Sequence, residues 1–255
     1  MNIQDIKRYR VTIDDETIEI GTAAELAIAL DVLNGTRDRA LLEQLAPHLA
    51  EILGDGAGLI LVYKSLTSAD QIFATQTLGA QFASVLGSAQ TLRDLLALLA
   101  DATVEQTIIA TLGADGLRAL IHHASELAQI LHWLYGDVDN QVLTLLGADY
   151  VRRLVHNGNE LSLALDAMHE KGEREFLDML GQERIRALIS DGRDLAYVLR
   201  ALPPQESIQI LQGYSPAQLA SLIDNANDWA YLWKRLEPAE AKFVAEKLGV
   251  DAYAA

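Results

Sequence analysis

The 255-residue chain contains no cysteine. This absence excludes disulfide bonds, thiolate nucleophiles and zinc sites built on cysteine ligands. A chain without disulfides suits a reducing compartment, so we expect a cytoplasmic protein.

Long apolar runs are also missing. The N-terminal stretch MNIQDIKRYRVTIDD has no apolar segment after its basic residues, and no stretch of the chain reaches 18 consecutive apolar residues. The sequence therefore predicts neither a secretory signal nor a membrane-spanning helix, and no membrane partner. Translocation into a host cell by another route stays open.

Basic residues are scarce: 20 Lys and Arg stand against 36 Asp and Glu, which gives a formal net charge of −16. A field of that sign repels phosphate backbones and attracts basic surfaces. We therefore expect a protein partner with a basic surface rather than a nucleic acid. Because half of the residues are hydrophobic, the chain is also expected to be ordered.

The sequence does contain a tandem repeat. The phrase LGADYVRRLVHNG at 146–158 has a near copy, LGADGLRALIHHA, 34 residues upstream at 112–124. Three apolar columns keep this period through seven units. They are Ile20, Leu53, Leu86, Ile121, Val155, Ile189 and Ile223; Leu26, Leu59, Leu92, Leu127, Leu161, Leu195 and Trp229; and Leu33, Leu66, Leu99, Leu134, Met168, Leu202 and Leu236. A fixed period of this length is typical of stacked supersecondary units.

Within a unit the apolar spacing is helical. Leu161, Ala164, Leu165 and Met168 fall at positions i, i+3, i+4 and i+7. A glycine recurs where the preceding helix is expected to break, at Gly79, Gly113, Gly147, Gly181 and Gly249, and Gly213-Tyr214-Ser215-Pro216 supplies a stop, an N-cap and a first-turn proline. Each repeat is therefore predicted to hold two short helices and one longer one. The predicted fold class is an all-α, right-handed α-solenoid of 34-residue repeats.

The two ends differ from the repeats. Residues 1–19 are predicted to form an N-terminal cap, in which Tyr9, Val11 and Ile13 alternate with polar residues. A turn at Asp14-Asp15-Glu16 and a return over 17–20 would complete a short β-hairpin, although a frayed helix stays open. Residues 20–249 are predicted to form one continuous solenoid, and residues 250–255 a C-terminal tail.

Two charged columns follow the same period. In five units an acid lies at the start of the second predicted helix, at Glu25, Glu126, Glu160, Asp194 and Asp228. A polar residue before it, such as Ser125, Asn159 or Asn227, is interpreted as the helix cap. Such acids stabilise helix N-termini, and the alternative is an acidic ladder for a basic partner or divalent ions. Arg118, Arg152 and Arg186 are expected either to pair with these acids between repeats or to line a groove for an anion.

The chain shows no constellation typical of an enzyme or a metal site. His122, His123 and His132 lie near Asp137 and Asp139, but no two histidines have the i, i+4 spacing that places both on one helical face. The sequence also lacks a P-loop, GxGxxG and GxSxG. We therefore predict a non-enzyme with no catalytic residue, no metal and no cofactor.

One column is neither uniformly apolar nor uniformly polar. It holds Ile28, Leu61, Asp94, Gln129, Leu163, Tyr197 and Tyr231, and a companion column four residues on holds Val32, Ser65, Leu98, Trp133, Ala167, Ala201 and Arg235. A position dictated by stacking would stay aliphatic, so this variation indicates a surface, although filling of the core flank is the alternative. Exposed Trp and Tyr commonly anchor interfaces. The predicted partner-binding residues are Gln129, Trp133, Leu163, Tyr197, Tyr231 and Arg235.

The segments VRRLVHNGN and IRALISDGR end a helix in a variable polar pair followed by glycine, which resembles the repeats of the TAL-effector class. That family reads DNA one base per repeat through this loop, so the resemblance implies that His156 and Asn157 face bases. It covers about a third of each unit. It departs at the start of the next helix, where the family's glycine-rich, lysine-containing segment is replaced by Asn159-Glu160 or Arg193-Asp194.

The sequence thus predicts a non-catalytic scaffold that binds a basic protein, in a role such as adaptor or bacterial effector. The alternative is a function connected with nucleic acid, either a base-reading array or an acidic mimic of DNA.

Overall fold

The computed structural model describes residues 7–33, 35 and 37–249, and this part of the chain is mostly helical with one two-stranded sheet. The chain folds into two compact units. The first contains residues up to 121 together with 133–145, and the second contains residues 122–132 together with 146 onward. The predicted tail, 250–255, and the first six residues of the predicted cap lie outside the described residues.

The first unit begins with the predicted hairpin. Strands β1 (Tyr9–Ile13) and β2 (Glu16–Ile20) pair antiparallel, with Tyr9 opposite Ile20 and Ile13 opposite Glu16. The two-residue turn uses Asp14 and Asp15, both at positive φ, as a tight hairpin requires. The hairpin is therefore confirmed, with the turn one residue shorter than the sequence suggested.

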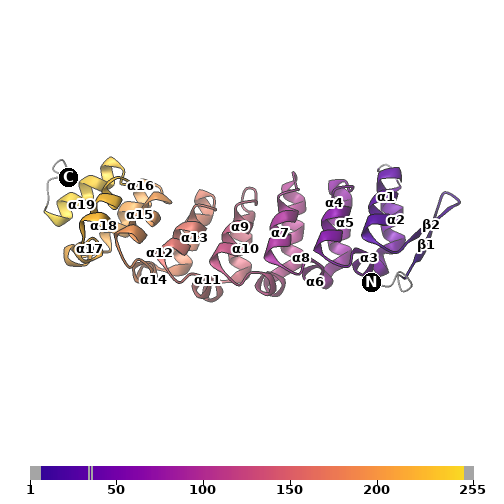
Figure 1. The fold of residues 1–255 in the computed structure, drawn as a ribbon, viewed down its shortest axis with the longest axis horizontal. Coiled ribbons are helices and arrows are strands. Elements are labelled where there is room, and N and C mark those ends of the chain that lie inside the picture. Colours follow the sequence, from indigo (N-terminus) through magenta and orange to yellow (C-terminus); the bar gives the residue numbers. More distant parts are fainter. Residues whose placement is uncertain (1–6, 34, 36, 250–255) are drawn as a thin grey trace. The chain divides into compact units, whose positions relative to one another are not determined.

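The rest of the first unit is helical. Its helices are α1 (Ala23–Leu33), α2 (Asp38–Leu45), α3 (Leu49–Leu53), α4 (Gly56–Tyr63), α5 (Ser68–Leu78), α6 (Phe82–Leu86), α7 (Ala89–Leu96), α8 (Ala102–Leu120) and α10 (Val138–Leu146), with 3-10 turns η2 (Ala46–His48) and η3 (Gly79–Gln81). Figure 1 shows α1, α4 and α7 side by side, and α1 packs on α4 as α4 packs on α7. Likewise α2 packs on α5, and α5 packs on α8.

The second unit repeats the plan. It contains α9 (Ala124–Leu131), α11 (Ala148–Leu154), α12 (Gly158–Leu165), α13 (Glu170–Leu180), α14 (Gln182–Leu188), α15 (Gly192–Arg200), α16 (Pro204–Gln212), α17 (Pro216–Leu222), α18 (Ala226–Trp233) and α19 (Pro238–Leu248). Here α9, α12, α15 and α18 pack consecutively, and α16 packs on α19. Leu161, Ala164 and Leu165 of the predicted apolar stripe belong to α12, and Met168 follows the end of that helix.

The glycine breaks occur where the sequence predicts them. Gly113 interrupts α8 with a φ of 58°, and Gly147 and Gly181 separate their long and short helices with a φ of 77°. Residues other than glycine rarely adopt this backbone region. Helices α11, α12 and α13 have 7, 8 and 11 residues, as the sequence predicts for one unit, whereas α15 and α16 have nine residues each.

The three apolar columns form the cores of the two units. The column from Ile20 to Ile223 is buried throughout, whereas Trp229 and Leu236, the last members of the other two, are half-exposed. The prediction that these two are core is only partly right. Among the described residues, α18 packs on α15 and has no equivalent helix on its other side.

Candidate functional site

The variable column of the second unit lies at the surface of consecutive helices. Gln129 on α9 and Leu163 on α12 are exposed, and Tyr197 on α15 and Tyr231 on α18 are half-exposed. Because these four helices pack in order, the four side chains occupy equivalent positions on neighbouring helices. The column is therefore not part of the core.

Three of the predicted site residues form a cluster. The rings of Tyr197 and Tyr231 meet edge to face with centroids 5.7 Å apart, and the guanidinium of Arg235 lies 3.5 Å from the Tyr231 centroid. Arg193 lies 5.9 Å from the same ring. The pKa of Tyr231 is raised, chiefly by its hydrogen bond with the Tyr197 side chain. The Arg235 guanidinium therefore brings a positive charge to this aromatic cluster, while Arg193 also pairs with Asp228.

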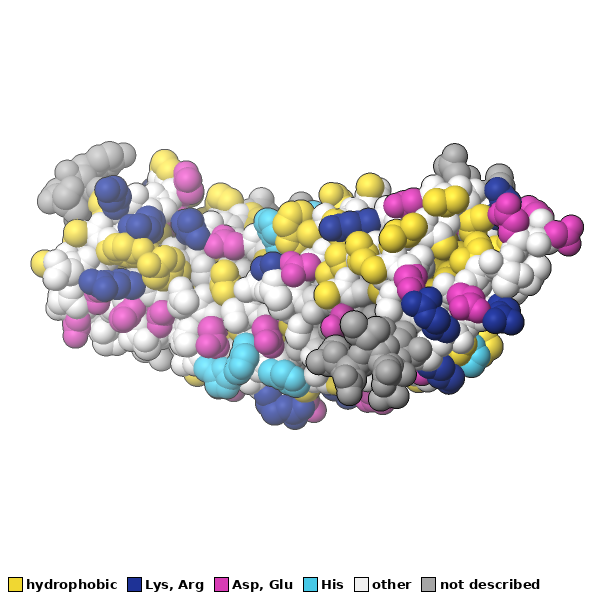
Figure 2. Space-filling model, turned by 45° about the vertical axis from the view of Figure 1, so that its right-hand side comes forward, with side chains coloured by type: hydrophobic (Ala, Val, Ile, Leu, Met, Phe, Trp, Pro, Cys, Tyr) yellow, Lys and Arg dark blue, Asp and Glu magenta, His cyan; other side chains and the backbone are white. Residues whose placement is uncertain are grey.

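The first unit carries an apolar row at the same two columns. Ile28 and Val32 on α1, Leu61 on α4 and Leu98 just after α7 are exposed, Val32 at 74%. Figure 2 shows hydrophobic side chains at the surface of this unit, on the right, among acidic and basic ones. Trp133 is 39% exposed and belongs to this unit rather than to the unit that holds the other five predicted site residues. Large apolar side chains therefore recur at equivalent surface positions of α1 and α4.

The residues of this apolar row were not among the predicted site residues. Aliphatic residues are the normal content of a repeat core, so the residue type alone gives no reason to name Ile28 or Leu61 as binding residues. The signal that finds them is their register, because they share a column with Gln129 and Asp94.

The acids at the start of each surface helix cap that helix. The carboxylate of Glu25 accepts a hydrogen bond from the Gly21 N–H, and Glu126, Glu160 and Asp194 accept from the N–H four residues earlier in the same way. The helix-capping interpretation is confirmed for these four acids, whereas the carboxylate of Asp228 accepts from the Asn225 side chain and pairs with Arg193. These carboxylates are held close to the backbone, which leaves them less free to bind a partner or an ion.

The cap residues themselves lie two positions before the predicted ones. Asn157, Asp191 and Asn225 are the N-caps, and each side chain accepts from the backbone N–H of its own helix. The prediction of Asn159 and Asn227 as caps is wrong, because helices α12 and α18 already begin at Gly158 and Ala226.

Two members of the arginine column, Arg152 and Arg186, have described partners that differ from the acids of the capping column. Arg152 pairs with Asp149 inside α11 at 3.6 Å, and Arg186 donates to the backbone carbonyl of Gly213 at 2.6 Å. Ion pairs between repeats use other residues, among them Arg193–Asp228 at 3.5 Å, Arg200–Asp166 at 2.7 Å and Arg174–Glu206 at 3.3 Å. Arg186 therefore joins two repeats through a carbonyl instead of an acid.

A second polar column, which sequence reasoning missed, is buried near the start of the long helices. Its buried members are Asp38, Asp70, Glu105, Asp139, Ser207 and Glu240. Glu105 has no exposed surface, and one of its oxygens accepts from the Tyr135 N–H at 3.0 Å while the other has no hydrogen-bond partner. Burial raises the pKa of Asp38, Glu105 and Glu240. The 33 to 35-residue spacing from Asp70 to Glu240 was the signal available in the sequence.

The burial of Glu105 predicts an unusual pH dependence. Because its pKa is raised above the ordinary 4.5, this group contributes stability below pH 4.5 that is lost as pH rises through the folded-state pKa.

Two variants of Glu105 test this pH dependence. Glu105→Gln keeps a hydrogen-bond acceptor without the charge, so its free energy of unfolding should be at least that of the parent at neutral pH and should vary less with pH. Glu105→Ala should lose about 1 to 3 kcal/mol, because the Tyr135 N–H loses its acceptor. Urea unfolding between about pH 4 and pH 7 measures both changes. Equal losses in the two variants at pH 7 would show that the charged carboxylate is required.

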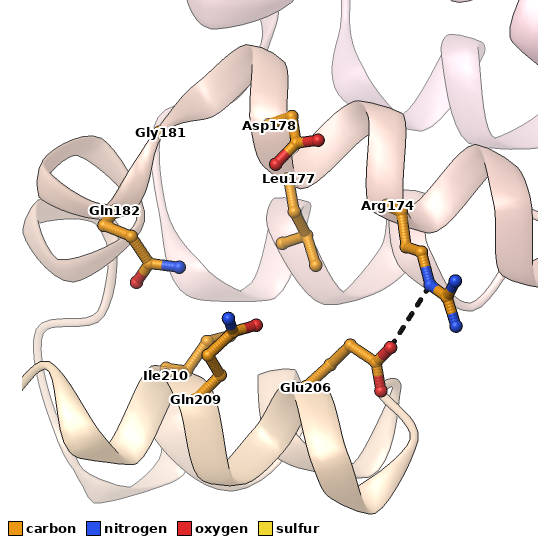
Figure 3. A pocket seen from close by; sticks show the side chains of 8 residues that line it. All are labelled: Arg174, Leu177, Asp178, Gly181, Gln182, Glu206, Gln209 and Ile210. Carbon is orange, nitrogen blue, oxygen red and sulfur yellow. Dashed lines mark hydrogen bonds and ion pairs between the residues drawn. The ribbon is translucent and has the colours of Figure 1, made fainter.

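No group of three or more His, Asp or Glu side chains in residues 7–33, 35 and 37–249 is placed to hold a metal ion. A pocket of about 290 Å³ lies between α13, α14 and α16. Figure 3 shows the Glu206 carboxylate turned toward Arg174, and the carboxylate of Asp178 on the other side of Leu177. The two carboxylates therefore do not converge on one point in this pocket.

Within the helices that the structure describes, none combines the length and the apolar character needed to span a bilayer.

Comparison of this chain with protein-family models, with curated proteins and with solved structures finds no match.

Proposed function

We propose that the repeats form one continuous right-handed α-solenoid that serves as a non-catalytic scaffold for a protein partner. Continuity is supported by the three apolar columns, which keep a spacing of 33 to 35 residues from Ile20 to Leu236. A scaffold of this kind presents one surface position in many copies.

The observation that carries the proposal is the recurrence of exposed apolar and aromatic side chains at one position of successive helices. Ile28 and Leu61 hold it on the first unit, and Leu163, Tyr197 and Tyr231 hold it on the second. Exposing them costs free energy in the isolated chain, and a partner that covers them removes that cost. Aromatic and arginine side chains such as Tyr231 and Arg235 are the types most often found at interface hot spots.

The net charge of −16 supports a basic partner. On the first unit, exposed Asp31 lies beside Val32 in the apolar row, so a basic residue bordering an apolar patch would fit there. Long-range attraction of this kind increases association rates and is screened by salt.

The test is affinity capture from a cell extract, followed by mass spectrometry. The first-unit variant combines Ile28→Ala, Leu61→Ala and Leu98→Ala, and the second-unit variant combines Leu163→Ala, Tyr197→Ala and Tyr231→Ala. Both should keep the helical circular dichroism of the parent, and at least one should lose proteins that the parent retains at low salt and releases at high salt. A matched control, Gln205→Ala with Gln209→Ala on the exposed face of α16, should retain them.

Two outcomes would count against the scaffold. If both variants fold and retain the same proteins as the parent, the variable column is not the binding surface. If a variant unfolds, its side chains belong to the core and the site is wrong.

The same net charge supports a second candidate, an acidic mimic of DNA that occupies basic DNA-binding proteins. A base-reading array is less well supported, because Asn157 and Asn225 use their side-chain oxygens as helix caps in the loop that would meet bases. Gel shifts at low salt distinguish these functions. Competition with duplex DNA for a basic protein favours the mimic, and direct binding of the duplex favours the reader.

A further inference from the structure

The hairpin of the first unit is held firmly along one face and one edge. Tyr9, Val11, Ile13 and Ile20 are buried, and β1 packs against α2. The Tyr9 ring stacks on His48 with centroids 4.0 Å apart, and its hydroxyl donates to Glu51. These contacts hold the hairpin in place, and they leave the outer edge of β2 uncovered by α2.

The edge of β1 is closed by a side chain. The Thr12 N–H donates to Gln44 Oε1 at 3.2 Å, and Gln44 Nε2 donates to the Thr12 carbonyl at 2.9 Å. The amide of Gln44 thus occupies both backbone groups of Thr12, much as a neighbouring strand would. The N–H and the carbonyl of Thr12 both point away from β2. Thr12 therefore belongs to a non-hydrogen-bonded pair of the β1–β2 ladder.

The partner of Thr12 in that pair is Thr17 on β2, so Thr17 directs its N–H and carbonyl to the opposite edge. Two residues on, Glu19 does the same. Among the described residues, no hydrogen bond reaches the backbone N–H or carbonyl of Thr17 or Glu19, and both residues are exposed. One edge of the hairpin is capped by Gln44, and the other remains available.

We propose that the outer edge of β2 binds an extended segment of a basic partner as a third, added strand. Backbone donors and acceptors that recur every second residue are matched by another extended backbone. Four such groups are available, the N–H and carbonyl of Thr17 and of Glu19. This surface is distinct from the variable column, and the inference does not depend on the proposed scaffold function.

The side chains of β2 define the chemistry of the added strand. Ile18 shares the buried face with Ile20 but is only half-buried, so an apolar residue of the incoming strand would cover it. Exposed acids, Asp15, Glu16 and Glu19, lie along the strand and its turn, and only Glu19 of these has a described arginine partner, Arg10. A Lys or Arg on the incoming strand would offset the remaining charge.

The same acids argue against a second copy of this chain as the occupant. Antiparallel pairing of β2 with another β2 would bring two acidic strands, each with Asp15, Glu16 and Glu19, side by side. Like charges across a strand pair are destabilising.

The experiment uses a fluorescent synthetic peptide, Lys-Val-Thr-Val-Thr-Val-Lys, titrated into the full chain. Bound peptide should slow hydrogen exchange of the Thr17 and Glu19 amides by about tenfold or more, measured by NMR, while the Ile18 amide, already in the ladder, changes little. The matched control is the same peptide N-methylated at alternate residues, which keeps charge and composition but loses the outward donors and should not bind. Glu16→Lys should weaken binding and leave the fold unchanged.

Three results would overturn the proposal. The first is unchanged exchange at Thr17 and Glu19 with saturating peptide. The second is equal binding of the N-methylated peptide or of a version with Glu in place of Lys. The third is concentration-dependent protection of these amides without peptide, which would make a second copy of the chain the occupant.

Discussion

Replacing Leu165 by alanine should lower the free energy of unfolding by about 2 to 5 kcal/mol. The Leu165 side chain on α12 is fully buried, and α12 lies between α9 and α15, so the neighbours on both sides cannot collapse onto the vacated space without moving the stack. Urea unfolding followed by circular dichroism measures the change. The equivalent residue one repeat later, Leu199, is also buried and should behave in the same way.

The matched control lies two residues away in the same helix. Leu163 is 43% exposed, so Leu163→Ala removes the same atoms from a partly wet position and should change stability by no more than about 0.5 kcal/mol. Equal losses at Leu163 and Leu165 would show that the inner and outer faces of α12 are wrongly assigned.

The second large effect is expected at Gly158, the first residue of α12. A Cβ at this position would lie 2.6 Å from the Cβ of Asp194 on α15, the next helix in the stack. Gly158→Val should therefore force the two helices apart and cost about 1 to 3 kcal/mol or more. The expected result is a lower unfolding midpoint in urea.

Asn159 provides the control for Gly158. It is the next residue of the same helix and is exposed, so Asn159→Val introduces the same β-branched side chain without a neighbour to displace. The Asn159 variant should stay within about 0.5 kcal/mol of the parent. A Gly158 variant as stable as the Asn159 variant would mean that close approach between repeats is not required here.

Gly158 belongs to a column of small residues, and close packing between neighbouring helices explains why they are small. Its members are Ala23, Gly56, Ala89, Ala124, Gly158, Gly192 and Ala226. A Cβ at Gly192 would lie 2.7 Å from the Ile223 side chain and 2.9 Å from the Cβ of Asp228, whereas Ala226, on the last helix of this kind, is exposed. The glycine after the polar pair, which carries the resemblance to TAL-effector repeats, thus has a structural reason that does not involve DNA.

The sequence by itself determined the repeat, its helices and their breaks. The periodicity predicts which positions are buried, because a position that faces a neighbouring repeat must be apolar in every copy. The column from Ile20 to Ile223 is an example. Local chemistry was equally informative at Gly147 and at Ser215-Pro216, where the backbone conformation is a property of the residues themselves. The hairpin followed from the alternation of Tyr9, Val11 and Ile13.

Only the tertiary structure decided which polar residues are buried and which apolar ones are exposed. Glu105 and Glu183 are both helical acids in the sequence, yet one is enclosed by neighbouring helices and the other is exposed. The partners of Arg186 and Gln44 are backbone carbonyls and amides of distant segments, and no side-chain pattern marks those groups in advance. The same holds for the open edge of β2, since the pairing of a backbone group depends on what the fold places beside it.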